Sequence, residues 1–146
     1  MKFDQIKLYL FDMDGTLYLG SRLFDFTIEL LNTIREKGGR YIFVTNNSSK
    51  SVADYVKKLA GLGIAATESD FLTSSQATAW FLKKNHPGKR LYVCGTQSLK
   101  NELMREGFEL TDDIDCTECI VMGFDTELTF KKLEDVSKML CTRDLP

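Results

Sequence analysis

Residues 6–16 read IKLYLFDMDGT, a short apolar run that ends abruptly in two carboxylates, a glycine and a threonine. The segment from Leu8 to Phe11 is too short for a secure helix and rich in aromatic and aliphatic residues, so we expect a buried strand. Asp12 and Asp14 follow just past its carboxyl end, where ligands bind in open α/β sheets. Because alternate side chains point to opposite faces of a strand, the two acids converge only if the chain has turned, as Gly15 permits.

Paired acids at the end of a strand have several interpretations. Their oxygen atoms suit a hard divalent cation, and they also suit acid/base chemistry, since neighbouring acids push their pKa values apart. The plainest alternative is a DxDG turn with an Asx-type hydrogen bond and no chemistry. An EF-hand calcium loop is excluded, because it needs further acids at fixed offsets where this chain has Leu17, Leu19 and Leu23.

A second polar cluster follows the aromatic and β-branched run from Arg40 to Val44, which we predict to be a strand. The cluster reads Thr45-Asn46-Asn47-Ser48-Ser49. The hydroxyl of Thr45 and the backbone N–H of Asn46 are donors that can hold phosphate oxygens. Taken alone, the cluster is also typical of a strand-to-helix turn with a helix cap.

The chain alternates predicted strands and helices. Apolar spacing predicts a helix over 23–37 capped by Asp25, a second helix to about residue 62 and a third over 74–84, with a strand at 71–73 between the last two. This order favours a parallel sheet with helices on its faces. The Pro-Gly pair in residues 85–88 marks a boundary. Beyond it, strands at 90–94 and 120–122 alternate with helices over 97–106 and 130–140.

The composition fits a globular chain and disfavours several classes of protein. The chain has 146 residues, 43% of them apolar and 27% charged, with a net charge of −2. There is no basic cluster for nucleic acid, and no apolar run approaches the length of a membrane span. Since a signal-peptide core is also lacking, we expect a cytoplasmic protein whose four cysteines are reduced. Cys116 and Cys119 have zinc-like spacing but no second pair of ligands.

The opening stretch resembles the first motif of the haloacid dehalogenase (HAD) superfamily. Residues 43–51, FVTNNSSKS, resemble its second motif in the form used by the NagD-like, 4-nitrophenylphosphatase branch. The resemblance implies an α/β fold, in which a Rossmann-like parallel-sheet core of three layers, α/β/α, is interrupted after its third strand by an α/β cap, with both parts incomplete in this chain. We place the core at residues 1–86 and the cap at residues 87–146.

The resemblance also assigns roles to individual residues. It makes Asp12 the nucleophile and a Mg²⁺ ligand, and Asp14 the general acid/base and a Mg²⁺ ligand. It makes Thr45, Asn46 and Asn47 the contacts to phosphate and substrate. The implied function is a Mg²⁺-dependent phosphatase that hydrolyses phosphate monoesters of small metabolites through an aspartyl-phosphate intermediate. The expected partner is a small phosphorylated metabolite, with neither nucleic acid nor membrane, and a homodimer through the cap is left open.

Two later motifs of the superfamily, a lysine and a late acidic motif, are not found in the sequence, which stops at Leu145-Pro146. We therefore expect a chain truncated within the cap. One alternative function is a catalytically impaired fragment or isoform that acts as a non-catalytic interaction or regulatory module. A second alternative is a phosphomutase, because phosphomutases of the superfamily share both acids.

Overall fold

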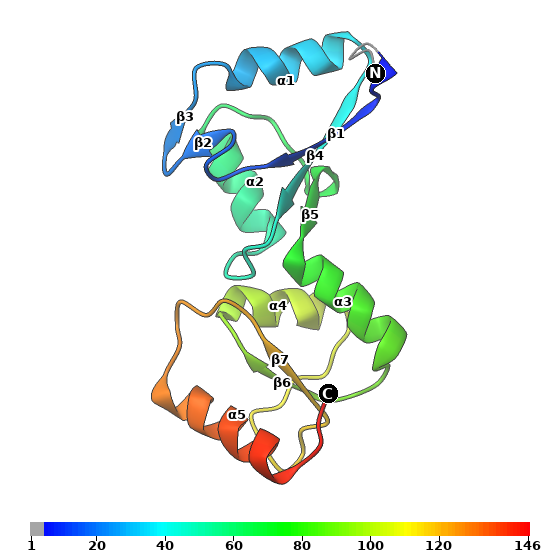
Figure 1. Ribbon diagram of the computed structural model, residues 1–146, viewed down its shortest axis with the longest axis vertical. Coiled ribbons are helices and arrows are strands. Elements are labelled where there is room, and N and C mark those ends of the chain that lie inside the picture. Colours follow the sequence, from blue (N-terminus) through cyan, green and yellow to red (C-terminus); the bar gives the residue numbers. More distant parts are fainter. Residues whose placement is uncertain (1–4) are drawn as a thin grey trace. The chain divides into compact units, whose positions relative to one another are not determined.

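The computed structural model describes residues 5–146, which form two compact units. The first unit contains the described residues up to 46 together with residues 52–73, and the second contains residues 47–51 and 74–146. Figure 1 labels the elements of both units. None of the described helices is long and apolar enough to cross a membrane.

The first unit is built on a parallel sheet, as the alternation of elements predicts. Its strands are β1 (Leu8–Asp12), β4 (Arg40–Thr45) and β5 (Phe71–Thr73), in the spatial order β1-β4-β5. The helices are α1 (Thr27–Glu36) and α2 (Val52–Gly61), and a short 3₁₀ helix, η2 (Glu68–Asp70), leads into β5. The parallel pairing brings the carboxyl ends of β1 and β4 to the same edge, which positions the candidate site.

Aromatic side chains cover one face of this sheet. Phe11, Phe43 and Phe71 stand side by side in register across the three strands, and they pack in one buried cluster with apolar side chains of α1 and α2. Burying a side chain as large as Phe43 contributes about 2–3 kcal/mol. The opposite face carries Leu8 and Leu10, which are 54% and 62% exposed.

The region after β1 differs from the prediction, which began a helix at residue 23. A short antiparallel hairpin forms there instead, made of β2 (Tyr18–Leu19) and β3 (Arg22–Leu23), with Gly20 at a positive φ of 59° in the turn. Helix α1 starts only at Thr27, and its N-cap is Phe26 rather than Asp25. The Thr27 hydroxyl donates to the carbonyl of Leu17 at 2.6 Å, so the helix begins where it can be tied to the turn after β1.

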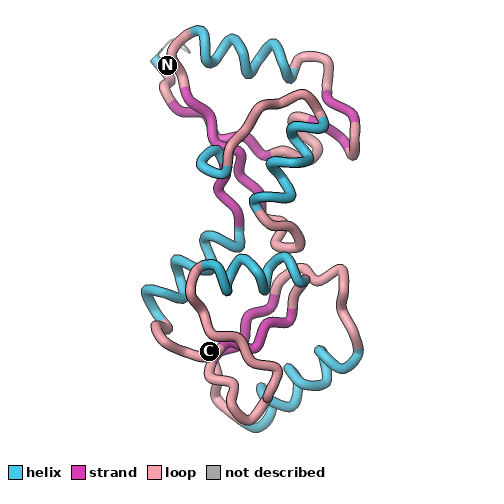
Figure 2. The backbone as a smooth tube through the Cα atoms, turned by 180° about the vertical axis from the view of Figure 1, so that it is seen from behind, coloured by secondary structure: helices cyan, strands magenta, loops and turns pink. Residues whose placement is uncertain are grey.

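The second unit is a parallel pair of strands with helices on both faces. The strands are β6 (Leu91–Cys94) and β7 (Cys119–Met122), and the helices are α3 (Ser74–Asn85), α4 (Gln97–Arg105) and α5 (Phe130–Thr142). Figures 1 and 2 both show the strands lying between α4 and α5. The predicted helix starts are confirmed, since Thr96 and Thr129 accept N-cap hydrogen bonds at α4 and α5.

The boundary between core and cap, predicted between residues 86 and 87, stays a prediction, and the two compact units of the structure divide elsewhere. Helix α3 belongs to the second unit, so the division lies between Thr73 and Ser74. The reason is packing: Ala79 and Leu82 of α3 are buried in one cluster with side chains of β6, α4 and β7. The Pro-Gly turn at residues 87–88 therefore connects two elements of the same compact unit.

Candidate active site

Two neighbouring strands of the first unit end in the residues that the sequence singles out. Asp12 is the last residue of β1 and lies opposite Val44 in the register, and Thr45 is the last residue of β4. Both acids are predicted to follow the strand, whereas Asp12 is in fact its last residue. Asp14 lies beyond the strand, and its backbone pairs with that of Tyr18 in an isolated β-bridge. Both carboxylates are exposed, while Thr45 is 9% exposed.

The turn after Asp12 is held by backbone hydrogen bonds. The carbonyl of Met13, a side chain only 1% exposed, accepts hydrogen bonds from the N–H groups of residues 16, 17 and 18 at 2.9–3.3 Å. Gly15 has a φ of 83°, the left-handed conformation expected of it, and donates to the carbonyl of Tyr18 at 2.7 Å. Thr16 donates its hydroxyl to Oδ2 of Asp12 at 3.3 Å. The two acids therefore stand on an exposed turn that is held by hydrogen bonds and anchored by the buried side chain of Met13.

Two buried tyrosines lie within electrostatic reach of both carboxylates. Burial raises the pKa of Tyr18 to about 12, and the charges of Asp14 and Asp12 add to the shift. Burial also raises the pKa of Tyr55, again with contributions from both acids. The hydroxyl of Tyr55 shares a hydrogen bond with Oγ1 of Thr45 at 3.4 Å, and Lys58 Nζ lies 4.0 Å from the ring centroid of Tyr18. We refer to Tyr18, Tyr55 and Lys58 as the inner layer of the site.

Sequence reasoning missed this inner layer. From the sequence alone, Tyr18, Tyr55 and Lys58 are given no role at the site. One signal was available: a buried tyrosine, unlike a phenylalanine, needs a partner for its hydroxyl. The partner itself, Thr45, is ten residues away from Tyr55 and becomes visible only when β4 and α2 are packed.

The predicted phosphate contacts divide between the two compact units. Asn46 is exposed and follows Thr45 in the first unit, whereas Asn47 is grouped with the second. The side chain of Asn47 accepts a hydrogen bond through Oδ1 from the N–H of Ser49 at 2.8 Å. The first unit therefore carries Asp12, Asp14, Thr45 and Asn46, and Asn47 is described with the second unit.

The donor atoms of the two acids fit a hard cation. Mg²⁺ prefers oxygen ligands, and proteins commonly bind it through one or two carboxylates while water and substrate phosphate complete its shell. Asp12 and Asp14 offer such a pair at the surface. Among residues 5–146, no group of three or more His, Cys, Asp or Glu side chains is arranged to hold a metal ion.

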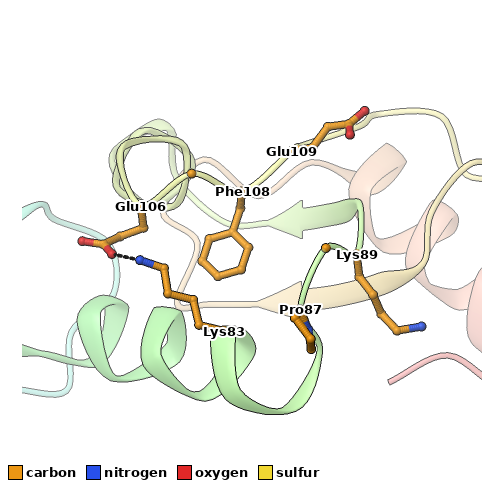
Figure 3. A pocket seen from close by; sticks show the side chains of 8 residues that line it. Lys83, Pro87, Lys89, Glu106, Phe108 and Glu109 are labelled. Carbon is orange, nitrogen blue, oxygen red and sulfur yellow. Dashed lines mark hydrogen bonds and ion pairs between the residues drawn. The ribbon is translucent and has the colours of Figure 1, made fainter.

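A separate pocket of about 300 Å³ lies in the second unit, at the ends of α3 and α4. Figure 3 shows Lys83 of α3 pointing toward Glu106, with which it forms an ion pair at 2.5 Å. Lys89 and Glu109 add one further charge of each sign to the lining. Because these charges balance, the pocket does not have the positive character that binding a phosphate dianion would favour.

The family of the chain follows from its comparison with known proteins. Residues 9–109 match the model of a family described as haloacid dehalogenase-like hydrolase. The chain therefore belongs to this family, and the superfamily predicted from its first motif is confirmed. The predicted α/β fold, with its parallel sheet and helices, is likewise that of its structural neighbours.

Among curated proteins, an acid sugar phosphatase of Staphylococcus saprophyticus is 35% identical over 127 residues, which are 87% of this chain and 49% of that protein. Among solved structures, the 4-nitrophenylphosphatase of Thermotoga maritima has a TM-score of 0.87 at 36% identity, over 94% of this chain and 52% of that one. NagD from Escherichia coli K-12 has a TM-score of 0.83 at 28% identity, over 94% and 54%. The predicted NagD-like, 4-nitrophenylphosphatase branch is thus confirmed.

A third solved structure bears on the metal. The glycerol phosphate phosphatase of Mycobacterium tuberculosis, in complex with magnesium, has a TM-score of 0.82 at 30% identity, over 91% of this chain and 40% of that one. The chain spans about half the length of the curated relatives it matches.

Proposed function

We propose that the chain carries the nucleophile and the acid/base of a Mg²⁺-dependent phosphatase that hydrolyses phosphate monoesters of small metabolites. The observation that supports this most strongly is the placement of Asp12 and Thr45 at the adjoining ends of β1 and β4, with Asp14 on the turn that directly follows β1. Membership of the HAD-like hydrolases and similarity to proteins named as phosphatases point to the same chemistry.

In the first step, a carboxylate oxygen of Asp12 attacks phosphorus while the bond from phosphorus to the leaving oxygen breaks. Asp14, in its protonated form, gives its proton to that oxygen, so that the alcohol leaves neutral. The product on the enzyme is an aspartyl phosphate on Asp12, which divides one difficult displacement into two easier ones.

In the second step, the carboxylate of Asp14 takes a proton from water as the water oxygen attacks phosphorus. The bond between phosphorus and the Asp12 oxygen breaks, which releases inorganic phosphate and restores both acids. The Thr45 hydroxyl and the Asn46 N–H are proposed to hold the phosphoryl oxygens as charge develops, and Asn47 to contact phosphate or substrate.

Asp12 and Asp14 would hold the Mg²⁺, Asp14 through its backbone carbonyl as the family resemblance implies. When bound, the cation neutralises the charge that otherwise keeps a phosphate dianion away from two carboxylates. The magnesium complex of the M. tuberculosis phosphatase supports this choice of metal.

The test is release of phosphate from 4-nitrophenyl phosphate by this chain. We expect turnover that needs Mg²⁺ and disappears in Asp12→Asn, which keeps the size of the side chain but removes the nucleophile. Turnover that survives this substitution would show that Asp12 is not the nucleophile. Product analysis with a sugar phosphate separates transfer to water from transfer to a second hydroxyl, which is the phosphomutase alternative.

A second candidate is the non-catalytic interaction or regulatory module named in the sequence analysis. The two candidates differ in ligand binding. A phosphatase site should bind inorganic phosphate in the presence of Mg²⁺ even where turnover is slow, whereas a folded sample that binds none favours the module.

A further inference from the structure

The turn from Asn47 to Ser51 is grouped with the second compact unit, although the residues on either side of it belong to the first. The chain therefore changes unit between Asn46 and Asn47, the two asparagines that the sequence predicts as neighbouring phosphate contacts. The contacts that hold this turn on the second unit decide where Asn47 lies.

Two side-chain hydrogen bonds attach the turn to the carboxyl ends of β6 and β7. The N–H of Phe124, just after β7, donates to Oγ of Ser48 at 2.8 Å across a sequence separation of 76 residues. The hydroxyl of Thr96, just after β6, donates to the carbonyl of Ser49 at 3.1 Å. The N–H of Gly123 donates to the carbonyl of Cys94 at 2.9 Å, which joins the two strand ends to each other.

Ser48 can approach Phe124 this closely because residue 123, which precedes Phe124, is a glycine. A Cβ at Gly123 would lie 2.8 Å from Oγ of Ser48 and 2.7 Å from Cδ2 of Leu99, which is a buried side chain of α4. Both distances are shorter than ordinary van der Waals contacts. A side chain at residue 123 would therefore clash with Ser48 in its present position.

Phe124, whose N–H donates to Ser48, lies on a loop that further polar contacts hold in place. Asp125, whose side chain is 3% exposed, forms an ion pair with Lys132 Nζ at 2.7 Å. The same ammonium donates to the carbonyls of Gly95 and Glu127 at 3.1 and 3.2 Å. The loop that carries Phe124 is thus held by contacts that do not involve Ser48.

We propose that Ser48 and Gly123 are positioning residues for Asn47: their contacts hold the 47–51 turn at the carboxyl ends of β6 and β7, and contact of Asn47 with a phosphate ligand depends on this arrangement of the turn. Within the turn, Oδ1 of Asn47 accepts from the N–H of Ser49 at 2.8 Å, which ties the orientation of its side-chain amide to the conformation of the turn. This inference rests on the proposed function, because it takes phosphate as the ligand.

The experiment is a titration of the isotope-labelled chain with inorganic phosphate in the presence of Mg²⁺, followed by amide NMR. In the unsubstituted chain, phosphate should shift the backbone signals of Thr45 and Asn46, the side-chain NH₂ signal of Asn47 and the amide of Phe124. In Ser48→Ala, the shifts at Asn47 and Phe124 should be lost and phosphate affinity should fall about three- to tenfold, the effect of one lost hydrogen bond.

Two further variants make the test specific. Ser48→Thr keeps the accepting hydroxyl and should restore the Asn47 shift, which a general loss of stability would not predict. Ser137→Ala makes the same chemical change at an exposed position of α5 in the same unit and should leave the titration unchanged. A measurement without any variant guards against unfolding: phosphate should slow hydrogen exchange of the Phe124 amide.

The outcomes separate the two proposals. If phosphate shifts Thr45 and Asn46 but Ser48→Ala leaves the Asn47 shift and the affinity unchanged, the positioning role is wrong and the proposed function stands. If the folded, unsubstituted chain shows no phosphate response at any of these residues, both the proposed function and the positioning role are wrong.

Discussion

Asp14 differs from Asp12 in what the proposed reaction asks of it, and a substitution can separate the two roles. A proton donor matters most when the leaving oxygen is basic. Asp14→Asn should therefore slow hydrolysis of an alkyl phosphate about 10²- to 10⁴-fold, but slow 4-nitrophenyl phosphate much less, because nitrophenolate leaves without a proton. The measurement is kcat/KM for both substrates, with Asp144→Asn, at an exposed position near the end of the chain, as the control. Equal losses for the two substrates would contradict the acid/base role.

Tyr92 makes the stability of the second unit sensitive to alkaline pH. Burial first, and then its hydrogen bond to Asp135, raise the pKa of Tyr92 to about 12. Below the ordinary tyrosine value near 10 the folded and unfolded chains are both protonated. Between that value and about 12 only the unfolded chain loses the proton, so stability must fall as the pH rises.

This linkage predicts that Tyr92 alone lowers the free energy of unfolding by about 1 kcal/mol between pH 9 and pH 11, and that Tyr92→Phe removes this part of the decline. Urea unfolding at both pH values measures it, with fluorescence of Trp80, the single tryptophan, reporting on α3 of the second unit. An unchanged pH dependence in Tyr92→Phe would show that the phenol is not held protonated by the fold.

At this scale, the sequence was informative where a residue type carries its own chemistry. The sequence singles out Asp12, Asp14 and Thr45 without any knowledge of packing. It does so through the two acids before Gly15 and through the Thr-Asn-Asn-Ser-Ser cluster at residues 45–49. The roles of Tyr18 and Tyr55 could not be predicted in this way, because they depend on which hydroxyls and carboxylates meet after folding.

Among the elements, the helices and strands with strong local signals were predicted closely, and the hairpin of β2 and β3 was not. Strands β4 and β7 and helices α3 and α5 each have a clear period, a cap or a glycine stop. Residues 18–23 have none of these over a sufficient length. Their conformation is set by burial of Tyr18, which is 1% exposed, and by the bond from Thr27 to Leu17.

The seat of Ser48 beside β7 predicts a large difference between two glycine substitutions. Gly123→Ala should destabilise the second unit by about 1–3 kcal/mol, because its Cβ meets Leu99 and Ser48 at distances that require the core to shift. Gly61→Ala, at the last residue of α2 with nothing within 4 Å of the added Cβ, should be neutral or stabilising by up to about 1 kcal/mol. Urea unfolding of both variants tests the difference, and a harmless Gly123→Ala would mean that the turn does not seat as described.

For the whole molecule, one face of the first unit's sheet is unusual. Parallel sheets are normally covered on both faces, yet Leu8 and Leu10 are more than half exposed, while Phe43 on the other face is 0% exposed. The curated relatives that the chain matches are about twice as long as the matched segment. The sequence motifs predicted the family and the parallel sheet, but exposure of one face depends on what packs against it and cannot be read from the periodicity of β1.

This asymmetry predicts unequal tolerance of the two faces in the 146-residue chain. Leu10→Gln should change the free energy of unfolding by less than about 0.5 kcal/mol, because the side chain is 62% exposed. Phe43→Ala should cost about 3–5 kcal/mol, because it empties the centre of the aromatic cluster. Unfolding followed by circular dichroism measures both, and a large loss in Leu10→Gln would mean that this face is covered in solution.

The central claim is that the carboxylate of Asp12 accepts a phosphoryl group when Mg²⁺ is present. Beryllofluoride, which mimics a phosphoryl group on a carboxylate, tests this without requiring turnover. Fluorine NMR of the chain should show a bound beryllofluoride signal that needs Mg²⁺, competes with inorganic phosphate and is absent in Asp12→Asn. A bound signal that persists in Asp12→Asn, or a folded chain that gives no bound signal with Mg²⁺, would contradict the account.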